Sequence, residues 1–179
     1  MTRGTRTKSA WVLALLLLAF SRPTPGPLVV GAVISAVGLV IRGWSAGTIR
    51  KDESLTTSGP YAFTRNPLYL GSFLIGVGLG TAGGHWVWPV LVIIYFVAVY
   101  GRTIADETAR LIELFGERYL EYAARVPTLV PRLRPYRSDV AGETSGFRWR
   151  QYVRNREWEA LLGTLGALAI LAARMRWPR

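Results

Sequence analysis

The stretch that decides the fold of this chain is NPLYLGSFLIGVGLGTAGGHWVWPVLVIIYFVAVYG, which runs from Asn66 to Gly101 without a formally charged residue. A helix needs about 20 mostly apolar residues to cross the hydrocarbon core of a bilayer. The glycine-rich segment at 80–85 divides the stretch near its middle, as a turn between two helices would. We therefore expect a helical hairpin in a membrane, with helices over 67–80 and 86–104.

Further apolar segments lie on both sides of this hairpin. Residues 9–21 and 28–47 are apolar and are separated by a proline-rich turn, and a shorter apolar segment follows at 159–174. We expect an all-α fold, a polytopic helical membrane protein with four to five transmembrane helices, in which residues 1–179 form a single membrane-embedded domain. Two points stay open. Residues 1–21 also have the composition of a cleavable signal peptide, and 159–174 can either span the membrane or lie on its surface.

The charge of the chain is unevenly distributed along the sequence. The 179 residues include 22 Lys and Arg against 11 Asp and Glu, a net charge of +11, although half of the residues are hydrophobic. Placing the N-terminus, 42–65 and 102–156 on one side of the membrane collects 18 of the 22 basic residues there. By the positive-inside rule that side is cytoplasmic. The excess of positive charge is then explained by the membrane topology of the loops and by their contact with anionic lipid. This explanation argues against a protein that binds nucleic acid.

These patterns predict an integral protein of the bacterial inner membrane, with its N-terminus and catalytic face in the cytoplasm and membrane lipids as partners. The chain has no Cys, and His85 is its only His. A thiolate or histidine metal cluster is therefore excluded, and we expect no metal.

The first segment with more polar detail than a membrane hairpin needs is 55–71. Pro67 fits the first turn of a helix, which places Arg65 and Asn66 at the helix N-terminus. Free backbone N–H groups and the helix dipole favour an anionic group there, so Arg65 is a candidate for holding a carboxylate. The alternative is that Arg65 extends to lipid phosphates and that Tyr61 and Tyr69 belong to the aromatic belt.

The second such segment is 102–131. Residues 104–115 carry charges at helical spacing and precede Gly116, so we expect the fourth helix to continue into the aqueous phase before it ends. Asp106 belongs to an i, i+4 ladder with arginines, whereas Glu107 lies about 100° round the helix and is less fully explained. Carboxylates near a membrane interface are functional candidates that accept hydrogen bonds from a diol or an ammonium group. The alternative is plain solvated helix charges.

Together the two segments resemble a known family. The matching residues are Gly59-Pro60-Tyr61, Arg65-Asn66-Pro67-Leu68-Tyr69-Leu70-Gly71, Asp106-Glu107 and Phe115-Gly116-Glu117-Arg118-Tyr119-Leu120-Glu121-Tyr122. Their pattern is similar to that of isoprenylcysteine carboxyl methyltransferases and the related phospholipid N-methyltransferases, integral-membrane enzymes that use S-adenosylmethionine without a Rossmann domain. Asn66 stands where the carboxyl enzymes have His, and Asp106 where they have Glu. Asn66 to Ser72 resembles the phospholipid version, and Phe115 to Tyr122 the carboxyl version.

The resemblance implies that S-adenosylmethionine binds between the third and fourth helices and leaves as S-adenosylhomocysteine. It implies catalytic roles for Arg65 and Glu107. The cofactor contacts that it implies are Tyr61, Arg65, Asn66, Tyr69, Gly71, Asp106 and Glu107. The acceptor contacts that we expect are Arg110, Tyr119, Tyr122 and Arg125. A carboxylate acceptor would need a cation, for which Arg65, Arg110 and Arg125 are candidates, whereas an amine would need a proton acceptor such as Glu107.

The expected activity is therefore methyl transfer to a lipid or lipidated small molecule, in the manner of an isoprenylcysteine carboxyl methyltransferase. Three alternatives remain. The first is a phospholipid (ethanolamine) N-methyltransferase, the second is an NADPH-dependent membrane reductase of the sterol-reductase type, and the third is a helical membrane protein without catalytic activity.

Overall fold

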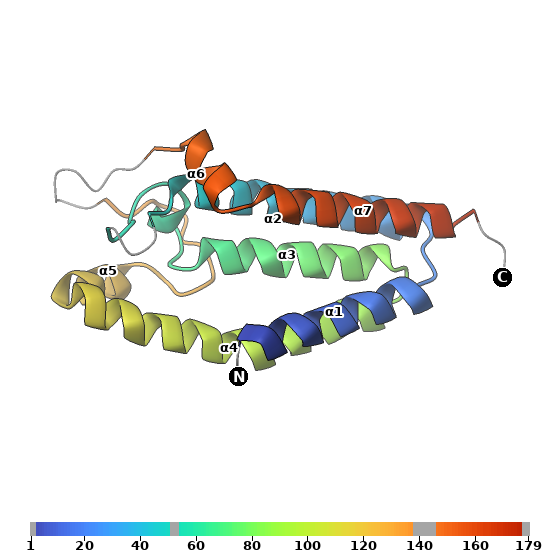
Figure 1. The fold of residues 1–179 in the computed structure, drawn as a ribbon, viewed down its shortest axis with the longest axis horizontal. Helices are drawn as coiled ribbons and strands as arrows, with labels where there is room; N and C mark the ends of the chain where they lie inside the picture. The colour runs from blue at the N-terminus through green and yellow to red at the C-terminus, as the bar shows by residue number, and fades with distance from the viewer. Residues whose placement is uncertain (1–2, 51–53, 138–145, 177–179) are drawn as a thin grey trace.

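The computed structural model describes residues 3–50, 54–137 and 146–176, excepting the side chains of residues 3–7. The elements in chain order are α1 (Arg3–Phe20), α2 (Pro25–Thr48), the 3-10 helix η1 (Gly59–Ala62), α3 (Pro67–Ala82), α4 (Val87–Phe115), α5 (Glu117–Arg125), α6 (Trp149–Arg154) and α7 (Trp158–Arg174). The longer helices run along an elongated molecule, and η1, α5 and α6 gather at one end (Figure 1). We call this end the polar end. The described residues contain no strand, which confirms the expected all-α fold.

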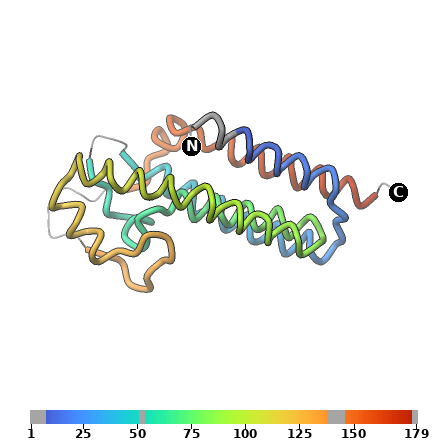
Figure 2. Tube along the Cα trace, turned by 90° about the horizontal axis from the view of Figure 1, so that it is seen from below, coloured from blue at the N-terminus to red at the C-terminus, as the bar shows by residue number. Residues whose placement is uncertain are grey.

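The predicted hairpin corresponds to α3 and α4, which lie side by side in Figure 2. Helix α3 begins at Pro67, where the missing N–H of proline costs no hydrogen bond. Helix α4 continues for 29 residues and ends before Gly116, whose φ of 55° favours glycine. The expectation that the fourth helix extends well beyond its apolar part is therefore confirmed.

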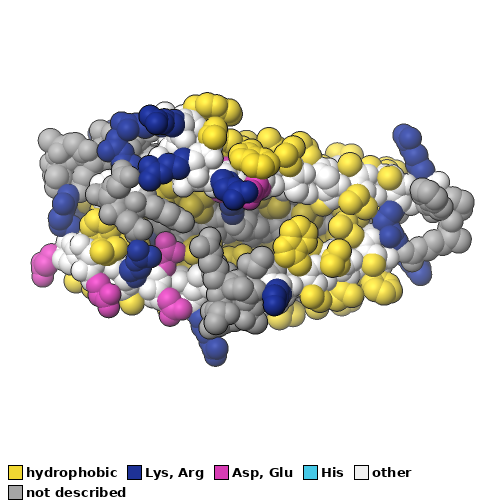
Figure 3. Space-filling view, viewed as in Figure 1, with side chains coloured by type: hydrophobic (Ala, Val, Ile, Leu, Met, Phe, Trp, Pro, Cys, Tyr) yellow, Lys and Arg dark blue, Asp and Glu magenta, His cyan; other side chains and the backbone are white. Residues whose placement is uncertain are grey.

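Two helices, α2 and α4, are long and apolar enough to cross a membrane. The apolar part of α1 (Lys8–Phe20) and α3 are shorter. Large apolar side chains on α2 and α4 are exposed, including Val33, Val40, Ile94 and Val97. In Figure 3 the acidic side chains gather mainly toward the polar end, while apolar side chains cover much of the rest of the visible face. Four to five membrane-spanning helices remain a prediction, and the parts of the predicted cytoplasmic loops at 51–53 and 138–145 lie outside the described residues.

Helices α2 and α3 pack with their backbones in close contact. A Cβ atom on Gly78 would lie 2.3 Å from Ser35 Oγ and 2.6 Å from the carbonyl oxygen of Gly31. One on Gly71 would lie 2.7 Å from the carbonyl oxygen of Gly38. Small residues allow this approach in lipid, where van der Waals packing drives helix association. The α2–α3 pair thus forms a rigid base for the polar end.

The polar end is held together by a loop that returns from α5 along η1. Tyr136 donates a backbone hydrogen bond of 2.8 Å to the carbonyl oxygen of Ala62, and Arg65 donates one of 2.9 Å to that of Pro127. Tyr119 and Tyr122 of α5 are buried in a hydrophobic cluster at this end of the molecule. This packing fixes the segment before α3 against the end of α4 and α5.

Candidate functional site

Two adjoining pockets open at the polar end between α3, α4 and the segment before η1. The first has a volume of about 80 Å³ and the second about 280 Å³. The lining that they share is Ile49, Tyr61, Arg65, Asn66 and Glu107. The first pocket is completed by Arg50, Ser54, Leu55, Thr56, Leu111, Phe115, Tyr119 and Tyr122. The second is completed by Arg42, Pro67, Leu68, Tyr69, Asn155 and Glu157.

Arg65 lies on the boundary between the two pockets. Its Nη2 donates to Thr128 Oγ1 at 2.5 Å, and its Nη1 donates to the hydroxyl of Tyr119 at 3.4 Å. Its Nε is buried and has no hydrogen-bond partner among the described residues. Arg65 also forms no ion pair within the described part of the chain. The site therefore presents an uncompensated positive charge with one unused donor.

Asn66 is the N-cap residue of α3, which confirms that it and Arg65 lie at the N-terminus of that helix. The side chain of Asn66 does not cap the helix. Instead its Nδ2 donates to the carbonyl oxygen of Thr128 at 2.9 Å, while the Thr64 hydroxyl donates to the same oxygen at 3.2 Å. The loop after α5 therefore positions the residues that precede α3.

Glu107 faces both pockets from α4. Its Oε2 accepts a hydrogen bond of 2.7 Å from the hydroxyl of Tyr69 on α3. Asp106 is exposed and does not line either pocket. Successive helical residues point about 100° apart, so only one of the two carboxylates faces the cleft.

Buried tyrosines of η1 and α5 meet at the wall of the cleft. The hydroxyl of Tyr122 donates to the carbonyl oxygen of Tyr61 at 2.6 Å. Burial raises the pKa of Tyr122 well above its ordinary value, and Tyr119 adds to the shift. Burial likewise raises the pKa of Tyr61, with contributions from Tyr122 and Glu107. The Tyr61 hydroxyl is buried and has no partner among the described residues.

Three polar residues of the second pocket were not predicted from the sequence. Arg42 comes from α2, while Asn155 and Glu157 come from the segment between α6 and α7. Arg42 and Glu157 form an ion pair with an N–O distance of 2.6 Å. Arg42 is the only charged residue between positions 23 and 43, a signal that could have drawn attention to it. Asn155 and Glu157 carry no comparable signal, because their segment is rich in polar residues.

The structure brings most of the predicted site residues together and separates others from them. The residues that line the pockets are Tyr61, Arg65, Asn66, Tyr69, Glu107, Tyr119 and Tyr122. Gly71 packs against α2 instead, and Arg110 is exposed on α4 in line with Asp106. Arg125 is exposed and pairs with Glu121 at 3.1 Å. The roles expected for these outlying residues remain predictions.

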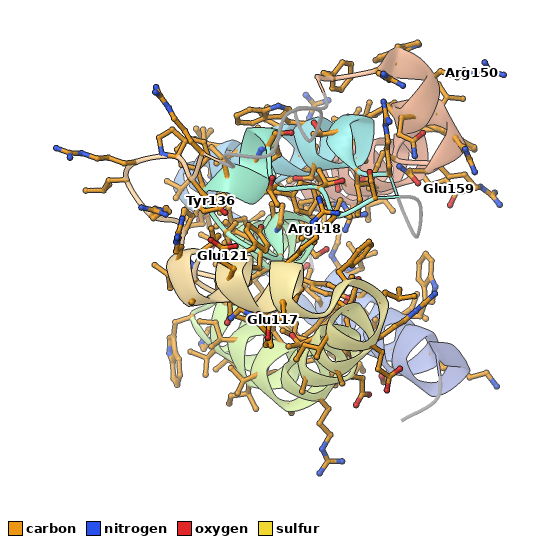
Figure 4. The ribbon with its side chains drawn as sticks, turned by 90° about the vertical axis from the view of Figure 1, so that its left-hand side faces the viewer. Glu117, Arg118, Glu121, Tyr136, Arg150 and Glu159 are labelled. Carbon is orange, nitrogen blue, oxygen red and sulfur yellow. The ribbon has the colours of Figure 1, made fainter. Side chains whose placement is uncertain are left out.

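The outer face of the polar end is crowded with charged and aromatic side chains from α5 and the loops. Figure 4 looks onto this face, with Glu117, Arg118 and Glu121 on α5. Tyr136 lies near Glu121, whereas Arg150 of α6 projects away at the edge. These side chains surround the cleft without lining it.

A third, mostly apolar cavity of about 180 Å³ lies farther along the bundle between α1, α3 and α4. Its walls include Phe73, Tyr95, Phe96 and Tyr100. The ring of Tyr100 contacts that of Tyr69 edge to face, with centroids 5.4 Å apart. Tyr69 lines the second pocket, so one aromatic contact links the polar cleft to the apolar cavity.

The comparison with known families decides the family of this protein. The sequence pattern of phospholipid methyltransferases matches residues 27–118, which include most of α2, all of α3 and α4 and the shared lining of both pockets. The chain belongs to the phospholipid methyltransferase family. Helix α7 lies outside the matched region, yet it runs alongside α2 (Figure 1).

Individual relatives carry two kinds of name. The cobalt-zinc-cadmium resistance protein CzcN of Cupriavidus metallidurans is 35% identical over 75% of this chain and 65% of its own length. The protein-S-isoprenylcysteine O-methyltransferase of Schizosaccharomyces pombe is 27% identical over 68% and 54%, and the Homo sapiens enzyme of that name is 36% identical over 49% and 31%. The chain therefore spans less than two thirds of the length of these relatives. No solved structure matches the chain significantly.

Proposed function

We propose that this protein is an S-adenosylmethionine-dependent methyltransferase that esterifies the carboxylate of a lipophilic acceptor. The observation that carries the proposal is the pair of adjoining pockets that share Tyr61, Arg65, Asn66 and Glu107. A transfer between two bound molecules needs two sites with a common wall, because the reacting atoms must lie within about 3–3.5 Å of each other in a fixed orientation.

The lining of the cleft fits the cofactor. The unused Nε of Arg65 suits a carboxylate, and the charge of Glu107 suits an ammonium group. Leu111, Phe115 and Tyr119 give the first pocket an apolar and aromatic wall suited to a nucleobase. Arg65 and Glu107 would therefore hold the amino-acid end of the cofactor between them.

When bound, S-adenosylmethionine supplies a methyl group activated by a positively charged sulfur. The residues of the chain then need to align the acceptor and exclude water. The buried tyrosines of α5 and the loop that is hydrogen-bonded to Arg65 would contribute to both tasks, because they pack against the wall of the cleft.

The apolar cavity supports a lipophilic acceptor. It lies among α1, α3 and α4, next to helices with exposed apolar faces, and the ring contact of Tyr69 with Tyr100 lies between it and the polar cleft. A hydrocarbon chain in this cavity would leave a polar headgroup in the second pocket. The same arrangement agrees with an inner-membrane protein whose cleft faces the cytoplasm, where the positive-inside rule places the polar end.

Calorimetric titration of the detergent-purified protein with S-adenosylhomocysteine tests the proposal, with NADPH titrated separately. We expect saturable S-adenosylhomocysteine binding that is lost in Arg65→Ala and in Glu107→Gln. Arg22→Ala is the matched control, because Arg22 is exposed at the opposite end of the bundle. Absence of binding at millimolar ligand would contradict the proposal, and binding of NADPH alone would favour a reductase.

A second candidate is phospholipid N-methylation, favoured by the two carboxylates, Glu107 and Glu157, that line the second pocket. An amine attacks only when neutral, and Glu107 would accept the proton. Labelled cofactor with phosphatidylethanolamine vesicles distinguishes this activity, since the label then enters an N-methyl group that alkali does not release, whereas alkali hydrolyses a methyl ester to labelled methanol.

A further inference from the structure

Arg42 is the one charged side chain that α2 contributes to the wall of the second pocket. Its side chain is 23% exposed, so it is partly buried and keeps some access to solvent. An arginine in an apolar helix is costly and needs a partner. Its surroundings show which partner it has and what remains available to a ligand.

Three of the five N–H groups of Arg42 are occupied. Its Nε donates to Glu157 Oε2 at 2.9 Å, its Nη2 donates to Oε1 at 2.6 Å, and its Nη1 donates to the hydroxyl of Ser72. A guanidinium group carries five donors in a rigid plane. Two N–H groups therefore have no partner among the described residues.

Glu157 reaches Arg42 because the segment before α7 docks on the end of α2. Arg148 donates a backbone hydrogen bond of 2.8 Å to the carbonyl oxygen of Gly47. The ring of Phe147 packs against the Cα atom of Gly47, in the space that a side chain would occupy. Asn155 Nδ2 donates to the carbonyl oxygen of Ala46 at 2.7 Å. This docked segment, residues 146–157, lies outside the region that matches the family. Glu157 is only 7% exposed, and its carboxylate holds the guanidinium plane in place.

The hydroxyl of Tyr61 is a further unused donor in the same pocket. Tyr61 is 6% exposed and its Oη has no partner in the described part of the chain. Its pKa is raised by burial, so the hydroxyl stays protonated and able to donate. Tyr61 and Arg42 line the same pocket.

We infer that Arg42 and the hydroxyl of Tyr61 bind the carboxylate of the methyl acceptor, and that Glu157 is a positioning residue for Arg42. The inference rests on the proposed function and specifies its acceptor site. Arg65 is already committed to the cofactor side of the cleft, so a second anion needs a second cation. Charge-assisted hydrogen bonds from a planar guanidinium group are the strongest recognition elements for a carboxylate.

The reaction balances without a proton donor or acceptor. A carboxylate oxygen forms the new bond to the methyl carbon while the bond from that carbon to sulfur breaks, and the electron pair of the broken bond stays on sulfur. The carboxylate loses its negative charge as it becomes an ester, and the sulfur loses its positive charge. The product no longer binds Arg42 as an anion, which favours its release.

Binding of acceptor probes tests the inference independently of turnover. The probes are palmitate and N-acetyl-S-farnesylcysteine, each compared with its carboxamide, titrated into detergent-purified protein with and without S-adenosylhomocysteine. We expect the wild type to bind at least one carboxylate about 10-fold or more tightly than its amide. The double variant Arg42→Gln/Glu157→Gln removes both charges, so that neither is left buried alone, and is expected to lose that preference. Its melting temperature and its affinity for S-adenosylhomocysteine report whether the fold is retained.

Two outcomes would overturn the inference. One is a wild type that does not prefer either carboxylate over its amide, and the other is a preference that survives in the double variant. Failure of the wild type to bind S-adenosylhomocysteine would instead count against the proposed function. A carboxylate preference that is lost in the double variant would still support the carboxylate site at Arg42 in that case.

The positioning role of Glu157 has its own readout. Glu157→Gln still accepts one hydrogen bond from Arg42 and is expected to keep most of the carboxylate preference, whereas Glu157→Ala is expected to lose it. Equal preference in these two variants would contradict the role.

Discussion

The hydroxyl of Tyr69 donates a hydrogen bond of 2.7 Å to Glu107 and thereby joins α3 to α4 at the wall of the cleft. The contact fixes the carboxylate in the orientation in which it faces both pockets. The Tyr69 ring also contacts the ring of Tyr100, which lines the apolar cavity. One tyrosine therefore links the polar and the apolar parts of the site.

Tyr69→Phe removes this hydrogen bond while keeping the ring. A hydrogen bond to a charged group contributes about 1.5–3 kcal/mol, so we expect S-adenosylhomocysteine to bind about 10-fold more weakly once Glu107 is no longer oriented. Titration calorimetry measures the change, with Tyr152→Phe on α6 as the matched control. Unchanged affinity in Tyr69→Phe would show that Glu107 is oriented without it.

Arg65→Lys keeps the charge at the N-terminus of α3 but loses the planar donor group. The hydrogen bonds to Thr128 and Tyr119 and the unused Nε donor disappear together. We expect a loss of about 10- to 100-fold in affinity for S-adenosylhomocysteine. The ammonium group of lysine is a point charge and does not replace the fixed, planar set of donors of the guanidinium group. Arg22→Lys serves as the control. Affinity equal to that of the wild type would mean that only charge matters at this position.

Gly78→Ala is expected to destabilise the protein. The new Cβ atom would lie 2.3 Å from Ser35 Oγ and 2.6 Å from the Gly31 carbonyl oxygen, so α2 and α3 would have to separate. Overpacking of this kind costs about 1–3 kcal/mol. Thermal unfolding in one detergent measures the effect. In the matched variant Gly101→Ala the Cβ atom has no neighbour within 4 Å, and the melting temperature is expected to stay level or rise. Equal melting temperatures for the two variants would contradict the packing.

Stability is expected to fall at alkaline pH because of the buried tyrosines. Burial raises the pKa values of Tyr61 and Tyr122 in the folded protein, whereas an unfolded tyrosine titrates near 10. Above about pH 10 the unfolded chain therefore releases protons that the folded protein retains, and the free energy of unfolding decreases. The melting temperature between pH 8 and pH 11 measures the decrease. Tyr122→Phe should lose less stability over this range than the wild type, and an equal loss would refute the assignment.

The orientation can be tested by cysteine labelling, because the chain has no native Cys. Leu133 is 99% exposed at the polar end, and His85 is exposed in the turn between α3 and α4. We expect a membrane-impermeant maleimide to label His85→Cys in intact spheroplasts and Leu133→Cys only in inverted vesicles. The reverse pattern would place the cleft on the other side of the membrane.

The local signals in the sequence predicted the helices well because they are properties of single segments. The uncharged stretch from Asn66 to Gly101, the proline at position 67 and the glycine at position 116 each act within one or two turns, so the limits of α3 and α4 follow from them. Helical spacing also separated Glu107 from Asp106 before their surroundings were known.

The sequence by itself determined the all-helical fold and much of the cleft, since Arg65 and Asn66 directly precede one helix of a hairpin, Tyr69 lies on that helix and Glu107 lies on the other. Only the tertiary structure decided that Arg42, Asn155 and Glu157 complete the second pocket. Arg42 and Glu157 are 115 positions apart in the chain and meet because the segment before α7 docks on α2. Such long-range pairing depends on the shape of the packed helices, which a local pattern of charge and hydropathy does not encode.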